Sequence, residues 1–223
     1  MFRITKDIEV LVWDLDGTLV DSISDIHAAL NIVLKDYKLP AISLEQARAM
    51  VGAGAGKLLE RAFDAVGGMD RYHSETVYNQ FSRYYSANSC VESQLYPGIT
   101  EALVQLKTNG FRHAICTNKP EAIARSILQQ LSIDHLFDAV VGGDTTPNRK
   151  PDPAPLQHCL SLMDTTAQQA LMIGDSAADV GVARAVAVPV ILLPWGYRSE
   201  SLDALAADVV VQDAPALIRI LAI

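Results

Sequence analysis

Along most of the chain, short runs of apolar residues alternate with stretches in which apolar residues have helical spacing. The short runs predict buried strands, and the stretches between them predict helices that pack on those strands. The predicted strands cover residues 8–13, 113–116, 139–141, 171–173 and 188–193, with one more after residue 208. The predicted helices cover residues 100–108, 121–131, 155–162 and 177–185, with one more at the end of the chain. This alternation predicts an α/β fold, a Rossmann-like parallel sheet with helices on both faces.

One segment near the N-terminus departs from this alternation, because its apolar residues recur every three or four positions with no strand between them. Ser43 is expected to begin a helix there, in a capping box with Gln46. The chain is therefore predicted to divide into an α/β core of residues 1–21 and 92–223, and an all-helical cap of residues 22–91 inserted after the first strand.

The overall charge argues against two classes of partner. Of the 223 residues, 26 are acidic and 18 are basic, which leaves a net charge of −8. This charge opposes binding to the phosphates of nucleic acids and to anionic membranes, both of which require clustered Lys and Arg. We expect no nucleic-acid partner and no association with membranes.

The sequence also predicts a cytoplasmic protein. The longest apolar stretch, residues 186–195, is about half as long as a membrane span. Charged residues near the N-terminus interrupt the apolar core that a signal peptide would need. The three cysteines, Cys90, Cys116 and Cys159, are widely spaced and odd in number, so we expect reduced thiols.

The most informative segment follows the first predicted strand. Asp14 and Asp16 are two positions apart on an extended chain, so their carboxylates point the same way and can hold a hard divalent cation such as Mg²⁺. Gly17 lets the chain turn away without a side chain that blocks this position. By itself, the segment also fits two chance acids at a solvated strand end.

Three further polar segments follow predicted strands. Thr117 and Asn118 lie between a strand and a helix, where a hydroxyl and backbone amides can hold an anion; alone, they also fit an ordinary helix cap. Lys150 can neutralise a bound phosphate, with a surface-loop lysine as the alternative. Asp175 and Asp179 are four positions apart where a helix begins, and Asp175 also fits an N-cap. Since the carboxyl ends of parallel strands border one crevice, these segments are predicted to converge there.

In this order and spacing, the four segments resemble the four motifs of the haloacid dehalogenase superfamily. The resemblance extends over essentially the whole chain and includes a helical cap inserted after the first motif. Within that superfamily, the chain is most similar to the phosphoglycolate phosphatases over residues 142–145, 150–156 and 195–197.

The resemblance implies a role for each acidic residue of the motifs. Asp14 is expected to be the nucleophile, which forms an aspartyl-phosphate. Asp16 is expected to protonate the leaving group and then to accept a proton from the attacking water. Mg²⁺ is expected to bind the Asp14 side chain, the Asp16 backbone carbonyl and Asp175. Asp179 is expected to orient Lys150 or the waters on the metal.

The other motif residues are expected to contact the phosphoryl group of the substrate. Thr117 and Lys150 are expected to steady its transferring oxygens. Gly17 and Asn118 are expected to border the same position.

The expected reaction is the hydrolysis of a small phosphomonoester, with 2-phosphoglycolate as the first choice and glycolate and phosphate as products. Sugar phosphates and pyrophosphate stay open as substrates. A sugar phosphomutase that uses the same aspartyl-phosphate is an alternative, as is a module that only binds phosphate. Thr18 favours hydrolysis, because the related phosphomutases tend to carry Val there. The expected partner is a small phosphorylated metabolite, and the enzyme is expected to be a monomer or a homodimer.

The cap is expected to choose the substrate, since the four motifs contact only the phosphoryl group. Lys57 and Arg61 are four positions apart and are expected to share a helix face, where either can pair with the carboxylate of phosphoglycolate. The alternative is that both are ordinary solvated charges. The glycine-rich stretch 52–58 lacks the spacing of a phosphate-binding loop; it resembles a cap loop that closes over the substrate, or a flexible helix junction.

Two other groups of side chains are interpreted as structural. The five histidines are expected at the surface or at helix ends. One aromatic cluster is expected to pack a face of a cap helix: Tyr72, Tyr78, Phe81, Tyr84 and Tyr85.

Overall fold

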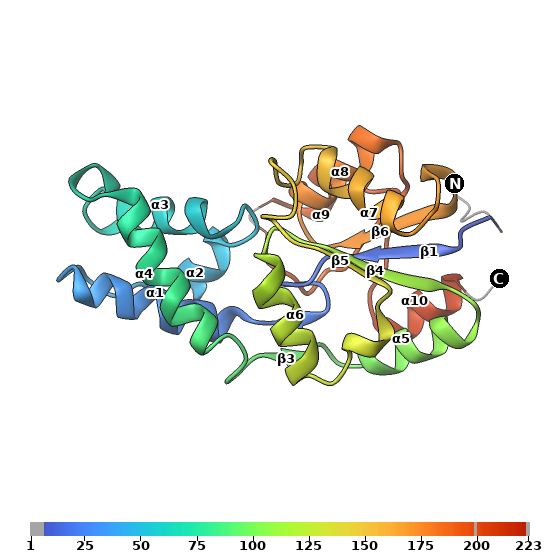
Figure 1. Ribbon diagram of the computed structural model, residues 1–223, viewed down its shortest axis with the longest axis horizontal. Helices are drawn as coiled ribbons and strands as arrows, with labels where there is room; N and C mark the ends of the chain where they lie inside the picture. The colour runs from blue at the N-terminus through green and yellow to red at the C-terminus, as the bar shows by residue number, and fades with distance from the viewer. Residues whose placement is uncertain (1–6, 199, 222–223) are drawn as a thin grey trace.

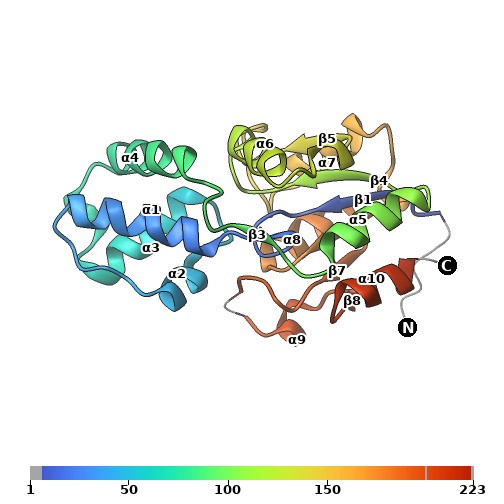
Figure 2. The ribbon, with the colours of Figure 1, turned by 90° about the horizontal axis from the view of Figure 1, so that it is seen from below.

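A parallel sheet lies at the centre of the computed structural model, which describes residues 7–198 and 200–221. Its six strands have the order β5-β4-β1-β6-β7-β8 (Figures 1 and 2). Leu11 of the central strand lies beside His113 on one side and Leu171 on the other. The strands are β1 (Val10–Trp13), β4 (Arg112–Cys116), β5 (Ala139–Val141), β6 (Ala170–Gly174), β7 (Val190–Leu192) and β8 (Val209–Val210).

Helices cover both faces of this sheet (Figure 1). Leu11 and Trp13 of β1 pack against α5, α6 and α10, whereas Val10 and Val12 pack against α7 and α8. This division follows from the alternation of side chains along a strand. The helices are α5 (Ile99–Thr108), α6 (Glu121–Gln130), α7 (Ala154–Leu162), α8 (Ala177–Val186), α9 (Leu202–Leu205) and α10 (Ala214–Leu221). Short 3-10 turns cover Met69–Arg71, Asp134–Leu136 and Ala167–Gln169.

A helical insert lies between β2 (Val20–Asp21) and β3 (Gln94–Leu95), which pair with each other as a short antiparallel ribbon. The insert has its own hydrophobic core and lies to one side of the central sheet (Figure 2). Its helices are α1 (Ile23–Asp36), α2 (Leu44–Met50), α3 (Ala55–Val66) and α4 (Ser74–Ala87). The predicted α/β fold with an inserted helical cap is confirmed. The exact division of the chain at residues 21/22 and 91/92 stays a prediction.

One buried carboxylate joins the two ends of the insert. Asp25, in the first turn of α1, accepts backbone hydrogen bonds from Val91, Glu92 and Ser93 at 3.0, 3.0 and 2.9 Å. The hydroxyl of Ser93 also donates to Asp25, at 2.6 Å. The chain that leaves the insert is therefore fixed to the helix that enters it.

The predicted strands and helices of the core nearly coincide with the observed ones. The capping box of Ser43 and Gln46 is also present. None of the helices in residues 7–198 and 200–221 is both long enough and apolar enough to cross a membrane.

His113 corrects the expectation that every histidine lies at the surface or at a helix end. It is completely buried in β4, and its Nδ1 accepts a hydrogen bond from Trp13 Nε1 at 2.9 Å. Burial lowers the pKa of His113 to about 4, so the imidazole is neutral near pH 7. A neutral ring with one satisfied nitrogen is compatible with a position in the core, which an imidazolium is not.

Candidate active site

The motif residues meet at the carboxyl ends of the central strands, next to the helical insert. Asp14 follows β1, Thr117 follows β4, and Asp175 follows β6. Lys150 comes from the loop after β5. Because neighbouring parallel strands end at the same edge of the sheet, these side chains are brought together as the sequence predicts.

Three buried carboxylates form a group that fits a hard divalent cation. The ligand oxygens of Asp14, Asp175 and Asp179 all lie within 4.8 Å of one another. Burial raises the pKa of Asp14 to about 6, although the neighbouring Lys150 ammonium lowers it. Burial also raises the pKa of Asp175 well above its ordinary range, and the charges of Asp179 and Asp14 raise it further. Crowded carboxylate oxygens of this kind are stabilised by a bound cation, and oxygen donors are what Mg²⁺ prefers.

The carboxylate of Asp175 is held on several sides. The Thr18 hydroxyl donates to its Oδ1 at 3.0 Å, and the backbone N–H of Tyr197 donates to its Oδ2 at 2.6 Å. A Cβ atom at Gly17 would lie 2.6 Å from the same Oδ2, and one at Gly196 would lie 2.1 Å from it. Gly17 also has a φ of 82°, so it makes the turn and leaves the space that the sequence predicts. The contribution of Gly196 becomes visible only in the folded chain.

Lys150 lies beside Asp14, with only 1% of its side chain exposed. Its Nζ is 3.0 Å from Asp14 Oδ1 and 2.6 Å from Asp179 Oδ1. Burial disfavours the ammonium, but Asp14 and Asp179 more than offset this effect, so the pKa of Lys150 is raised and the group is charged. Asp179 therefore contacts Lys150 directly, while its role toward waters on a metal stays a prediction.

Asp16 has partners that sequence reasoning missed. Its Oδ1 accepts a hydrogen bond from the Ser22 hydroxyl at 2.5 Å and lies 2.8 Å from Lys119 Nζ. Lys119 in turn donates a hydrogen bond to the hydroxyl of Tyr85, which belongs to α4 of the insert. Lys119 directly follows Asn118 in the second motif, and this position in the sequence could have indicated that Lys119 belongs to the site. Tyr85 packs on Phe81 as expected for the aromatic cluster, but its hydroxyl also reaches the core.

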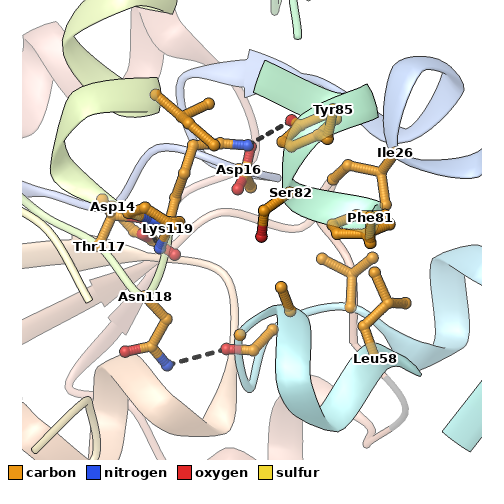
Figure 3. A pocket seen from close by; sticks show the side chains of 16 residues that line it. Asp14, Asp16, Ile26, Leu58, Phe81, Ser82, Tyr85, Thr117, Asn118 and Lys119 are labelled. Carbon is orange, nitrogen blue, oxygen red and sulfur yellow. Dashed lines mark hydrogen bonds and ion pairs between the residues drawn. The ribbon is translucent and has the colours of Figure 1, made fainter. Parts of the chain in front are cut away.

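A small pocket lies between the insert and the core next to Asp16, Lys119 and Tyr85 (Figure 3). Its cavity measures about 60 Å³. Asn118 Nδ2 donates to the carbonyl oxygens of Gly52 and Lys150, each at 3.0 Å, so it connects the glycine-rich loop of the insert to the core. The residues that line the pocket are Asp14, Asp16, Ile26, Val51, Gly52, Gly54, Ala55, Leu58, Phe81, Ser82, Tyr85, Thr117, Asn118, Lys119, Pro120 and Ile123.

Lys57 and Arg61 are not brought to this pocket. Lys57 is exposed and pairs with Glu60 at 2.7 Å. Arg61 donates to the carbonyl oxygen of Met50 at 2.9 Å, at the end of α2. The two cations therefore lie on the surface of α3, as the alternative interpretation expected.

The fold and the carboxylate site define a haloacid dehalogenase-like hydrolase. The family model described as "Haloacid dehalogenase-like hydrolase" matches residues 11–193, so the chain belongs to this family.

The relatives specify the kind of enzyme. The chain is 41% identical over 194 residues to the phosphoglycolate phosphatase of Colwellia psychrerythraea. The aligned region covers 85% of this chain and 86% of the relative. It is 39% identical over 214 residues to the phosphoglycolate phosphatase of Rhodospirillum rubrum, with 94% and 89% covered. A crystal structure described as a predicted phosphoglycolate phosphatase from Haemophilus somnus 129pt has a TM-score of 0.90 at 32% identity and covers 97% of this chain and 99% of its own. The chain is therefore a phosphatase of the haloacid dehalogenase-like family.

Proposed function

We propose that this enzyme hydrolyses 2-phosphoglycolate to glycolate and phosphate with bound Mg²⁺. The observation that carries the proposal is that Asp14 and Asp16 both line one small pocket, so a nucleophile and an acid–base group face the same substrate. The phosphoglycolate phosphatases that match at about 40% identity support the choice of substrate.

The first step in this proposal transfers the phosphoryl group to the protein. An oxygen of Asp14 attacks phosphorus, and the bond between phosphorus and the glycolate oxygen breaks. Asp16 donates a proton to that leaving oxygen. Lys150 and Thr117 hold the phosphoryl oxygens, with Asn118 and Gly17 bordering them.

The second step regenerates the carboxylate of Asp14. Water attacks the phosphorus of the aspartyl-phosphate, Asp16 accepts the proton of that water, and phosphate leaves. Asp14, the Asp16 backbone carbonyl and Asp175 would hold Mg²⁺, which would supply positive charge that offsets the repulsion between a carboxylate and a phosphate dianion. Asp179 maintains the position of Lys150 through both steps.

The walls of the pocket support a small substrate over a sugar phosphate. Apolar side chains face much of the cavity, among them Ile26, Leu58 and Phe81 (Figure 3). Against these apolar side chains, the hydroxyl groups of a sugar would lose water without gaining hydrogen bonds, which opposes binding. The same argument disfavours a sugar phosphomutase, in agreement with Thr18.

Charge and cysteine chemistry support the expected surroundings of the enzyme. The net charge of −8 favours a small metabolite over a nucleic acid as partner. Cys90, Cys116 and Cys159 are free thiols, as expected for a protein of the reducing cytoplasm.

A phosphate-release screen with Mg²⁺ tests the proposed substrate. The panel contains 2-phosphoglycolate, several sugar phosphates and pyrophosphate. We expect kcat/KM for 2-phosphoglycolate to exceed the others by at least about tenfold, the value of one well-placed polar contact. A sugar phosphate that is hydrolysed faster would overturn the choice of substrate. If a sugar phosphate is isomerised without phosphate release, the enzyme is a phosphomutase and the proposed hydrolysis is wrong.

A further inference from the structure

Lys119 is the only lysine or arginine among the described residues that line the pocket. Only 3% of its side chain is exposed, and its ammonium lies 2.8 Å from Asp16 Oδ1. Burial opposes a charge at this position, but Asp16 and Tyr85 more than offset it, so the pKa of Lys119 is raised. The pocket therefore presents one fixed positive charge on its wall.

The size of the expected substrate limits where its second anionic group can bind. In 2-phosphoglycolate, one oxygen and one methylene carbon separate the phosphorus from the carboxyl carbon. A group that binds this carboxylate must therefore face the same pocket as Asp14. Lys119 meets this requirement, whereas Lys57 and Arg61 do not.

Lys119 and Tyr85 each retain a hydrogen-bond donor for a ligand. An ammonium has three N–H donors. Asp16 and the Tyr85 hydroxyl engage two of them, and no other acceptor within the described residues contacts this nitrogen. The Tyr85 hydroxyl accepts from Lys119, so its own proton is available, and burial raises the pKa of Tyr85 to about 12, which keeps that proton in place. Figure 3 shows the polar ends of Lys119 and Tyr85 together beside Asp16.

We propose that Lys119 and Tyr85 bind the carboxylate of the substrate and make the enzyme selective for small phosphomonoesters that carry a carboxylate next to the ester. This inference rests on the proposed function and adds the residues that choose the substrate. Because the same ammonium contacts Asp16, a carboxylate bound to it holds the ester oxygen near the group that protonates that oxygen. Lys119 belongs to the core and Tyr85 to the insert, so the two parts of the chain form one anion site between them.

The test compares 2-phosphoglycolate with ethyl phosphate, in which a methyl group replaces the carboxylate. The measured quantity is the ratio of kcat/KM for the two substrates, because a general loss of activity cancels in this ratio. Lys119→Met removes the charge and keeps the length of the side chain. We expect the ratio to fall by roughly tenfold to a hundredfold, as for the loss of a buried charge-assisted hydrogen bond. Tyr85→Phe removes only the hydroxyl, and we expect a fall of about threefold to tenfold.

Lys107→Met is the matched control. Lys107 pairs with Asp138 at 3.5 Å and does not line the pocket. The ratio of kcat/KM for the two substrates should therefore stay at the wild-type value in this variant. If a thermal melt shows that Lys119→Met does not fold, Tyr85→Phe alone decides the outcome. If the folded variants keep the wild-type ratio of kcat/KM for 2-phosphoglycolate and ethyl phosphate, the inference is overturned. This holds even where kcat/KM falls equally for both substrates.

Failure of the proposed function gives a different result. In that case the wild-type enzyme itself shows no preference for 2-phosphoglycolate over ethyl phosphate. A wild-type preference that survives in the folded variants rejects only the assignment of Lys119 and Tyr85.

Discussion

Lys150 Nζ lies 2.6 Å from Asp179 Oδ1, and both side chains are almost completely buried. The other oxygen of Asp179 accepts hydrogen bonds from the backbone N–H groups of Asp175 and Ser176 and from the Ser176 hydroxyl. Asp179 therefore positions both the Lys150 ammonium, which is proposed to hold the phosphate, and the loop that carries Asp175, a proposed metal ligand.

Replacement of Asp179 should impair stability and catalysis together. Asp179→Asn leaves the buried Lys150 ammonium without its nearest carboxylate, so we expect the free energy of unfolding to fall by roughly 3 kcal/mol. We expect kcat to fall by roughly a hundredfold, since Lys150 loses its position. Urea unfolding and steady-state phosphate release measure the two effects. Glu60→Gln removes only an exposed ion pair and should change stability by less than about 1 kcal/mol. Wild-type kcat in a folded Asp179→Asn variant would contradict the positioning role.

The two carboxylates of the first motif should differ in their contribution. Asp14→Asn removes the proposed nucleophile, and we expect turnover to fall by roughly ten-thousandfold or more with the fold intact. Asp16→Asn removes the proposed acid–base group, which should lower turnover by roughly a hundredfold to ten-thousandfold. Steady-state phosphate release measures both. The assigned roles are wrong if Asp14→Asn stays within about tenfold of the wild type, or if Asp16→Asn equals it.

Removal of divalent metal should stop turnover reversibly. The crowded oxygens of Asp14 and Asp175 offer hard ligands, so activity should disappear after chelation and dialysis and return with added Mg²⁺. Ca²⁺ should bind without restoring activity, because its larger size and higher coordination number misplace the nucleophile and the phosphate. Full activity after exhaustive chelation would exclude a metal-dependent reaction.

A methyl group at Gly196 should disturb the proposed metal ligand. The added Cβ would lie 2.1 Å from Asp175 Oδ2, so the carboxylate has to move. We expect Gly196→Ala to lower kcat by roughly a hundredfold and to raise the Mg²⁺ concentration needed for half-maximal activity. Gly56→Ala is the control, because nothing lies within 4 Å of its added Cβ. A Gly196→Ala enzyme with wild-type Mg²⁺ dependence would show that Asp175 tolerates the displacement.

The neutral, buried His113 should make stability depend on pH. Its pKa is about 4 in the folded protein and 6.5 as the ordinary value, so between these values the unfolded chain binds more protons. Stability should therefore fall as the pH is lowered through this range, by up to about 3 kcal/mol from this group. Urea unfolding at about pH 5 and pH 7 measures the loss, and His113→Gln should reduce it. An equal loss in the variant would assign the effect to other groups.

Sequence reasoning located those site residues whose positions follow from a local pattern. Asp14, Thr117 and Asp175 directly follow apolar runs, and the topology of a parallel sheet then brings the ends of those runs together. Lys119 and Tyr85 meet because α4 lies against the loop after β4. Neither hydrophobic periodicity nor motif spacing reports the distance between two segments that are joined only through the folded insert.

The helical phase explains the outcome for Lys57 and Arg61. Their spacing places them on one face of α3, but it does not say which way that face points. The buried residues of α3 are Leu58, Leu59, Ala62 and Phe63. This apolar face packs into the insert and directs the two cations to solvent. His113 was missed for a related reason. Its neutral state depends on burial, and its hydrogen-bond partner Trp13 is brought to it only by the pairing of two strands in the folded chain.

The pairing of Val20 with Leu95 makes the two ends of the insert direct neighbours. This ribbon is separate from the six-stranded sheet, so the length and shape of the chain between its strands do not affect the order of the core strands. Evolution can therefore exchange, extend or shorten the insert without rearranging the core. New substrates can be acquired in this way while Asp14 and Asp16, the carboxylates proposed to react, stay in place.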